Sequence, residues 1–288
     1  MLSKLLNYQS ERGLFPTIGK KGNSNRELNS IYLHSFVLEY LIDNHAKNCP
    51  NEIQKGLDFI LSQAVKEDGQ IVWRWLKEHP TPEDYRPTDT DDTARARLVI
   101  EKALRKGFRV PKKFREFDYK NFFLPLMTKE GAIKTYTRNR SSQICPEVNA
   151  NILYNLVHTN CNSQLKKRIT NYLGGVLESD YLTKENFEEG SKYFLSPYFL
   201  LYILSKINSI EPKLFPKRAN QRIIDITKSL THRNKLDNVW CSTILRNYSL
   251  DSSPEGLSFE ETPIFQAKSL REKYSCPSAT AVFCLETQ

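Results

Sequence analysis

Residues Asp89-Thr90-Asp91-Asp92-Thr93-Ala94, written DTDDTA, carry the strongest signal in this 288-residue chain. Three carboxyl groups lie within four residues, directly before the helical run 95–106. Ionised carboxylates this close repel one another, and the repulsion is relieved when one of them keeps its proton, which raises its pKa. A protonated carboxyl with hydrogen-bonding neighbours is a Brønsted acid, and a helix N-terminus here would add N–H donors and a positive dipole end.

Two other interpretations of the same residues stay open at this point. An Asp at the N-cap or in the first turn of a helix is ordinary capping chemistry, although three in this register exceed what a cap needs. Clustered carboxylates also suit hard cations such as Mg²⁺ or Ca²⁺. The residues by themselves therefore predict an acid, a cap or a cation site.

The motif DxDDTA resembles the acid motif of class II terpene cyclases, the squalene–hopene cyclase family. In that family the middle Asp protonates an alkene or an epoxide of a linear isoprenoid. The resemblance implies that Asp91 is the general acid and that Asp89 and Asp92 support it. It implies no cofactor, with Mg²⁺ entering only if the substrate is a diphosphate.

Two further segments follow in the same order as in the family. The sequence E-V-N-A-N-I-L at 147–153 resembles the family's D-V-T-A-H-V-L helix, whose His hydrogen-bonds the catalytic Asp. The matching residue here is Asn151, which can donate a hydrogen bond to Asp91 but cannot take up its proton as a His can. The sequence P-S-A-T-A at 277–281 resembles the family's P-S-Q-T-A-W, with Ala279 and Val282 at the Gln and Trp positions.

The hydrophobic pattern predicts an all-α chain without a sheet. Residues 51–66 place Ile53, Leu57, Ile60 and Leu61 on one helical face, and residues 26–45 are apolar over most of a helical circumference. The first pattern is typical of an amphipathic helix and the second of a helix buried on several sides. Further helices are expected at 163–178, 194–207, 218–230, 236–248 and 278–285.

A faint internal repeat sets the expected architecture. Glycines recur roughly every 60 residues and each is followed by an aromatic residue: Gly13 with Phe15, Gly69 with Trp73, Gly131 with Tyr136, Gly190 with Tyr193 and Gly256 with Phe259. A fixed period indicates a repeat fold. About six helix pairs would close into a single α/α barrel over residues 1–288, with buried inner helices and amphipathic outer helices.

Parts of this repeat resemble the family's QW motif, in which a Gln and a Trp tie a helix end to the next loop. The best copy contains Gln63, Asp68-Gly69 and Trp73. The first copy keeps Gln9 but has Phe15 in the Trp position. The whole resemblance is to the one family barrel that carries the acid. A cavity that usually lies between two barrels would here be closed by the barrel itself, by a homodimer or by a partner domain.

Composition narrows the classes of partner. Hydrophobic residues make up 39% of the chain, enough for a sizeable core, and the formal net charge is +9. This basicity favours acidic partners such as a diphosphate or an anionic membrane surface, while the lack of a zinc finger, an RNP-type motif or a basic arm argues against nucleic acid. The six cysteines form no CxxC pair and no secretory leader is apparent, which predicts reduced thiols and a cytoplasmic location.

Aromatic faces stabilise carbocations by cation–π attraction. The substrate-binding candidates are Tyr193, Trp73, Trp240 and Tyr198, each of which also suits plain core packing. Tyr193 is favoured because its segment resembles the family's aromatic-rich stretch before a buried helix.

Three hypotheses of function remain. The first is a class II terpene cyclase-like enzyme acting on a linear prenyl substrate, free or attached to another group. The second is a barrel of the protein-prenyltransferase β-subunit type, whose zinc site would use Asp237 and Cys241 but finds no His near Cys276. The third is a non-catalytic barrel that binds a lipid or a protein. An apolar, aromatic-lined pocket ending at Asp91 would favour the first, and a filled barrel the third.

Overall fold

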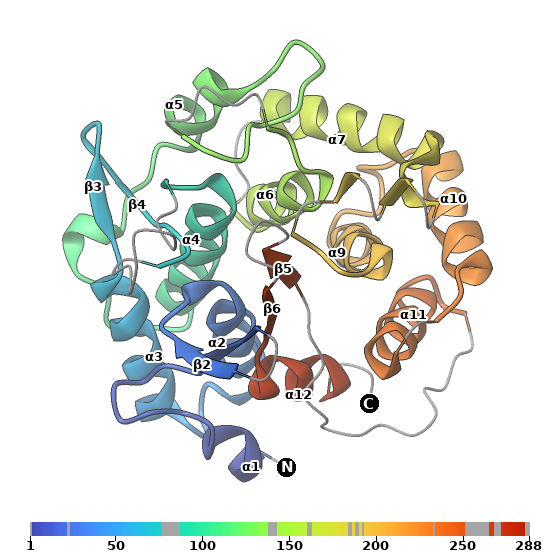
Figure 1. The fold of residues 1–288 in the computed structure, drawn as a ribbon. Coiled ribbons are helices and arrows are strands. Elements are labelled where there is room, and N and C mark those ends of the chain that lie inside the picture. The colour runs from blue at the N-terminus through green and yellow to red at the C-terminus, as the bar shows by residue number, and fades with distance from the viewer. Residues whose placement is uncertain are drawn as a thin grey trace.

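The computed structural model describes residues 2–21, 24–76, 87–137, 143–159, 163–183, 186–187, 190–191, 193–232, 234–250, 265–267 and 272–285. Helices dominate these ranges, with eleven α-helices among the described residues. Six of them form a closed inner ring (Figure 1): α2 (Ile31–His45), α4 (Thr90–Arg105), α6 (Pro146–His158), α9 (Pro197–Ile210), α11 (Lys235–Asn247) and α12 (Pro277–Leu285). Each packs against the next, and α12 packs back on α2.

The other helices lie outside this ring. Helix α3 (Pro50–Ser62) packs on α2 and α4, α7 (Ser163–Glu178) on α6, α10 (Lys217–Ser229) on α9 and α11, and α1 (Leu2–Leu6) on α12. The short α5 (Tyr119–Phe123) lies on the outer side near α4 and α6 (Figure 1). Inner helices are buried over nearly their whole length whereas α3 and α10 each bury one face. The predicted all-α barrel with two concentric rings is confirmed.

The sequence pattern gave no indication of the small sheets that accompany these helices. Strands β1 (Thr17–Lys21), β2 (Ser24–Leu28), β5 (Phe265–Ala267) and β6 (Glu272–Ser275) form an antiparallel sheet in the order β2-β1-β6-β5. Strands β3 (Val65–Glu67) and β4 (Gln70–Val72) form a hairpin. Strands of three to five residues are too short for a clear alternation, and Ile18 pairs with Ser275 far along the chain. Local periodicity carries no information on such a pairing.

These strands also shorten two predicted helices. Residues 26–28 belong to β2, and α2 begins only at Ile31, after Ser30 caps it by accepting a hydrogen bond from the Tyr32 N–H. Helix α3 ends at Ser62, and β3 follows. Because β2 leads into α2 and β6 leads into α12, the four-stranded sheet lies at the N-terminal ends of the inner helices (Figure 1).

Two of the repeated glycines, Gly13 and Gly131, let loops pack closely on the backbone of outer helices. Gly13 and Gly131 have φ angles of +87° and +91°, and a Cβ at either position would lie 2.3 Å from the Lys55 carbonyl oxygen or 2.7 Å from that of Arg168. Helices α3 and α7 carry these two carbonyls. Gly256 and Phe259, the last predicted copy, lie outside the described residues.

Hydrogen bonds of the QW kind join loops to helix α3, but not every residue of the predicted motif takes part in them. The Trp73 indole N–H donates to the Ile60 carbonyl of α3 at 2.8 Å. Gln9 donates to the carbonyls of Gly13 and Glu52, both at 2.9 Å, and so joins a loop to the start of α3. Gln63 instead contacts the neighbouring Ser62 hydroxyl.

Two sequence predictions concern compartment. In the part of the chain that the structure describes, no helix has the length and apolarity needed to cross a bilayer. Cysteines 49, 145, 241, 276 and 284 are all buried, and Cys161 lies outside the described residues.

The glycine geometry yields a stability prediction. Gly13→Ala should destabilise the protein by several kcal/mol, because it adds a clash with a backbone carbonyl to the cost of a left-handed residue, which is about 1–2 kcal/mol. The matched control is Gly107→Ala, since Gly107 has a similar φ of +83° but open space around its Cβ position. This control should lose only the free energy of placing a residue with a Cβ in the left-handed conformation. Equal losses in urea unfolding would contradict the proposed contact between the loop and α3.

Candidate active site

The DTDDTA stretch forms the N-terminus of inner helix α4. Asp89 is the N-cap, and its carboxylate accepts a hydrogen bond from the Asp92 N–H at 2.7 Å. Thr93 Oγ1 donates to the Asp89 carbonyl at 2.9 Å, and the Thr90 hydroxyl is bonded to backbone carbonyls near Thr135. The capping interpretation therefore holds for Asp89, but Asp91 and Asp92 are not used as caps.

Asp91 and Asp92 are buried, with 6% and 2% of their surfaces exposed. Burial raises the pKa of Asp91 well above its usual range, and the nearby Asp89 charge adds to this shift. Burial and both neighbouring carboxylates likewise raise the pKa of Asp92. Burial raises the pKa of Asp89 to about 6, although hydrogen bonds from Asp92 oppose the shift. Both shifts favour the protonated forms of Asp91 and Asp92, and a hydrogen bond between carboxyl groups joins Asp92 to Asp89.

Two neutral side chains from adjacent inner helices meet Asp91. Tyr32 of α2 and Asn151 of α6 both hydrogen-bond its carboxyl, and these bonds lower its pKa against the effect of burial. Asn151 Nδ2 also donates to the Tyr32 hydroxyl oxygen at 2.9 Å. Asn151, which the sequence placed near Asp91, and Tyr32 thus both adjoin its carboxyl.

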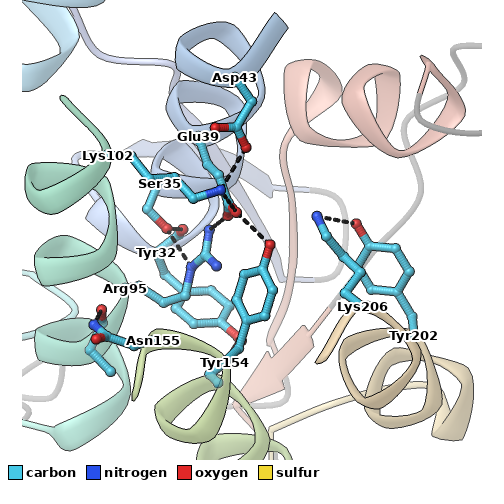
Figure 2. A network of polar contacts seen from close by, with 12 residues as sticks. Tyr32, Ser35, Glu39, Asp43, Arg95, Lys102, Tyr154, Asn155, Tyr202 and Lys206 are labelled. Carbon is cyan, nitrogen blue, oxygen red and sulfur yellow. Dashed lines mark hydrogen bonds and ion pairs between the residues drawn. The ribbon is translucent and has the colours of Figure 1, made fainter. Parts of the chain in front are cut away.

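A buried polar network continues from this site along the ring (Figure 2). One turn after Asp91, the Arg95 guanidinium donates from Nε to Ser35 Oγ at 3.1 Å and from Nη2 to Glu39 Oε2 at 2.7 Å. Glu39 also accepts from Lys102 Nζ at 2.9 Å and from the Tyr154 hydroxyl at 2.8 Å. Although burial alone would raise it, Lys102 and Arg95 hold the pKa of Glu39 well below its usual range.

Of the four aromatic candidates, Tyr193 lies at the acid end of the ring, that is, the end where Asp89 and Asp91 begin α4. Its hydroxyl is 2.6 Å from the Tyr136 hydroxyl and accepts from Gln143 Nε2 at 2.5 Å, and the Asp89 charge contributes to raising its pKa, after burial. Trp73 adjoins Asp89 only through its backbone. Its indole donates to α3 and packs on Phe114, so that this side chain lies outside the inner ring.

The other two aromatic candidates lie away from Asp91. Trp240 of α11 packs against Phe199 and Phe283 in the centre of the ring. Tyr198 of α9 donates its hydroxyl proton to the Leu230 carbonyl at 2.7 Å and therefore joins the inner ring to α10. A cavity of about 430 Å³ opens beside it, lined among others by Leu182, Phe187 and Pro197, and none of the predicted site residues lines it.

The metal-binding hypotheses find no supporting group of ligand side chains among the described residues. Within the ranges that the structure describes, no three His, Cys, Asp or Glu side chains are arranged to hold a metal ion. Asp237, a zinc ligand in the prenyltransferase hypothesis, accepts a hydrogen bond from Ser196 Oγ at 2.5 Å at the start of α11.

Sequence reasoning missed Tyr32, Glu39 and Arg95. Tyr32 and Glu39 belong to a run whose apolar pattern is typical of a core helix, so nothing local marks them. Arg95 offered a signal: it is a charged residue one turn after Asp91, in a helix whose first fourteen residues are nearly all buried. A buried arginine requires a partner.

The comparisons with known proteins concern the fold. No protein-family model matches the chain, and no curated protein sequence is significantly similar to it. Solved structures do match. The type II terpene cyclase MstE from Scytonema, in complex with geranylgeranyl dihydroxybenzoate as substrate, is 11% identical with a TM-score of 0.67, covering 99% of this chain and 94% of that chain. Its apo form is 10% identical with a TM-score of 0.66, covering 99% and 95%.

A larger protein matches over part of its length. The ent-copalyl diphosphate synthase from Streptomyces platensis is 12% identical with a TM-score of 0.59, covering 89% of this chain and 49% of that chain. The chain thus spans about half the length of this synthase and nearly all of MstE. The chain adopts the fold of the type II terpene cyclases.

Proposed function

We propose that this protein is a class II terpene cyclase-type enzyme that protonates a linear prenyl chain, with Asp91 as the general acid. One observation carries the proposal: Asp91 is a buried carboxyl whose pKa burial and the neighbouring Asp89 charge raise, which favours its protonated form. It lies at the start of an inner helix in a fold shared with type II terpene cyclases. A dry site is required, since water would level any acid stronger than hydronium.

The neighbouring residues take distinct roles. Asp89 and Asp92 hold one proton between them and keep the start of α4 in place. Tyr32 and Asn151 hydrogen-bond the Asp91 carboxyl and stabilise the carboxylate left after proton transfer. Asn151 cannot itself accept the proton, so reprotonation of Asp91 proceeds through solvent or another group.

The proposed substrate is a linear prenyl chain carrying a head group. This agrees with the substrate named for MstE, a geranylgeranyl dihydroxybenzoate. The sequence shows no additional acidic diphosphate–Mg²⁺ motif, which favours a non-diphosphate head group. Of the four aromatic candidates, only Tyr193 is proposed to face the substrate, since its hydroxyl and ring lie at the acid end. We further propose that residues 1–288 act as one barrel.

One observation favours a second function, a non-catalytic binding barrel. Phe36 of α2 meets Phe199 of α9 across the ring and Phe283 of the neighbouring α12, with centroids 5.9 and 5.6 Å apart. Helices α2 and α9 lie on opposite sides of the ring (Figure 1), so aromatic side chains fill its axis at this level. A substrate chain would therefore lie toward the N-terminal ends of the inner helices, where Asp91 is found.

The proposal predicts a selective loss of activity. Asp91→Asn keeps the shape but removes the transferable proton, so turnover should fall by about 10²-fold or more. Asp89→Asn and Asp92→Asn should reduce turnover less. Turnover would be measured by product analysis with geranylgeranyl diphosphate and geranylgeranyl dihydroxybenzoate. Asp237→Asn is the matched control, a buried first-turn Asp of another inner helix, and should stay active. Full activity of Asp91→Asn would refute the acid role, and prenyl binding without turnover would favour the binding barrel.

Burial of the Asp91 proton also predicts a pH-dependent stability. Below pH ~4 the carboxyl is protonated in both the folded and unfolded states. Above it, the unfolded chain releases a proton that the folded protein retains, so Asp91 costs stability increasingly as the pH rises toward its folded-state pKa. Asp91→Asn should therefore raise the melting temperature at pH 7 but leave it unchanged near pH 3. Asp118→Asn, at the exposed N-cap of α5, should show no such gain. An equal effect of Asp91→Asn at both pH values would contradict the raised pKa.

A further inference from the structure

The proposed acid chemistry needs a positive charge beside the conjugate base of Asp91. The chain has neutral Asn151 where the resemblance places a His. Asn151 and Tyr32 can donate hydrogen bonds to Asp91 but carry no charge. On the basis of the proposed function, we propose that Arg95 is the positioning residue that stabilises the Asp91 carboxylate once its proton has been transferred.

Placement on the helix brings the two side chains to one face. Arg95 lies four residues after Asp91 in α4, a spacing at which side chains are neighbours. Its side chain is fully buried. The guanidinium is held by Ser35 and Glu39, and its Cζ lies 3.7 Å from the centre of the Phe36 ring. These contacts come from α2 and fix the plane of the group.

Two polar atoms remain available. Among the described residues, Arg95 Nη1 and Asp91 Oδ1 are both buried without a hydrogen-bond partner. Buried donors and acceptors are almost always satisfied, so two such atoms one helical turn apart need an explanation. A carboxylate formed on Asp91 during the reaction would supply a charge for Nη1 to face.

The other groups around Asp91 do not supply a cation. Asp89 and Asp92 on its own helix are acidic, Tyr32 of α2 is neutral with its pKa raised by burial, and Asn151 of α6 does not titrate. Cys145, at the start of α6, has its pKa raised by burial and is neutral as well. Arg95 is the cation that opposes the raised pKa of Asp91. In a buried site this attraction is far stronger than in water.

The charges balance through the step. The Asp91 O–H bond breaks and its electron pair stays on the carboxylate. The alkene π electrons form the new C–H bond and leave a tertiary carbocation. Arg95 remains protonated throughout, because an arginine does not release its proton in a protein. It therefore acts only through Asp91, by making that carboxyl a stronger acid.

The test is the pH dependence of kcat. Asp91 must be protonated to react, so activity falls on the alkaline side with its pKa in the complex. Arg95→Met removes the charge at similar length. This substitution should lower kcat by about 10-fold or more. It should also shift the alkaline limb of the pH–kcat profile, where activity falls, to higher pH by about one unit. Arg95→Lys keeps a charge and should hold the limb closer to that of the wild type.

The matched control is Glu39→Gln, which weakens the same buried network but leaves the guanidinium. It should lower the melting temperature without moving the limb upward. If Arg95→Met does not fold, the double variant Arg95→Met/Glu39→Gln removes both members of the buried pair, a change that proteins often tolerate. An alkaline limb that stays in place in Arg95→Met or in the double variant would overturn the inference while leaving Asp91 as the acid.

A readout independent of turnover separates this inference from the proposed function. Infrared titration follows the protonated carboxyl band that Asp91→Asn abolishes. Its midpoint should rise in Arg95→Met even if no prenyl substrate is turned over. An unchanged midpoint contradicts the role of Arg95, whereas a shifted midpoint in a protein without cyclase activity supports the electrostatic coupling and refutes only the proposed reaction.

Discussion

The carboxylate of Glu39 is the interaction on which the inner ring depends most. It lies on α2 and accepts hydrogen bonds from Arg95 and Lys102 of α4 and from Tyr154 of α6 (Figure 2). A buried charge is costly unless it is paired and fully hydrogen-bonded, and removal of one partner of such a pair costs about 3–5 kcal/mol. Three neighbouring helices are thereby held in one relative position.

The relative position of α2, α4 and α6 sets the geometry around Asp91. Tyr32 lies two turns before Glu39 on α2, Asp91 one turn before Arg95 on α4, and Asn151 one turn before Tyr154 on α6. The network that fixes the helices at one level thus aligns the three site residues at the next level toward the N-terminal ends. Both levels are buried, and burial by itself raises the pKa of both carboxyls. The Asp89 charge adds to this rise at Asp91, whereas Lys102 and Arg95 overcome it at Glu39.

The contrast between these two carboxyls explains why Glu39 favours its ionised form and Asp91 its protonated form. Glu39 faces two cations, whereas Asp91 faces two other acidic side chains and one cation whose other nitrogens are already bonded. The positive end of the α4 dipole alone does not ionise Asp91, because Asp89 already occupies the cap.

Much of this protein is determined by its sequence alone. The period near 60 residues and the alternation of buried and amphipathic helices predict the two-ring barrel, because each helix pair buries its faces locally. The DTDDTA stretch predicts an acid, a helix cap or a cation site at the start of a helix, and the residues by themselves leave these three open. The resemblance at 147–153 pointed to Asn151 as a neighbour of Asp91, and its role in the proposed reaction stays a prediction.

Only the tertiary structure decided the rest. The pairing of β1 with β6 joins residues over 250 positions apart, and no local pattern encodes a contact at that distance. Trp73 and Tyr198 carry the same aromatic signal as Tyr193, and only packing shows that they contact outer helices instead of the acid end. Tyr32 and Arg95 became part of the site because closure of the ring brings α2 against α4. Their surroundings, and hence their chemistry, come from residues of other helices.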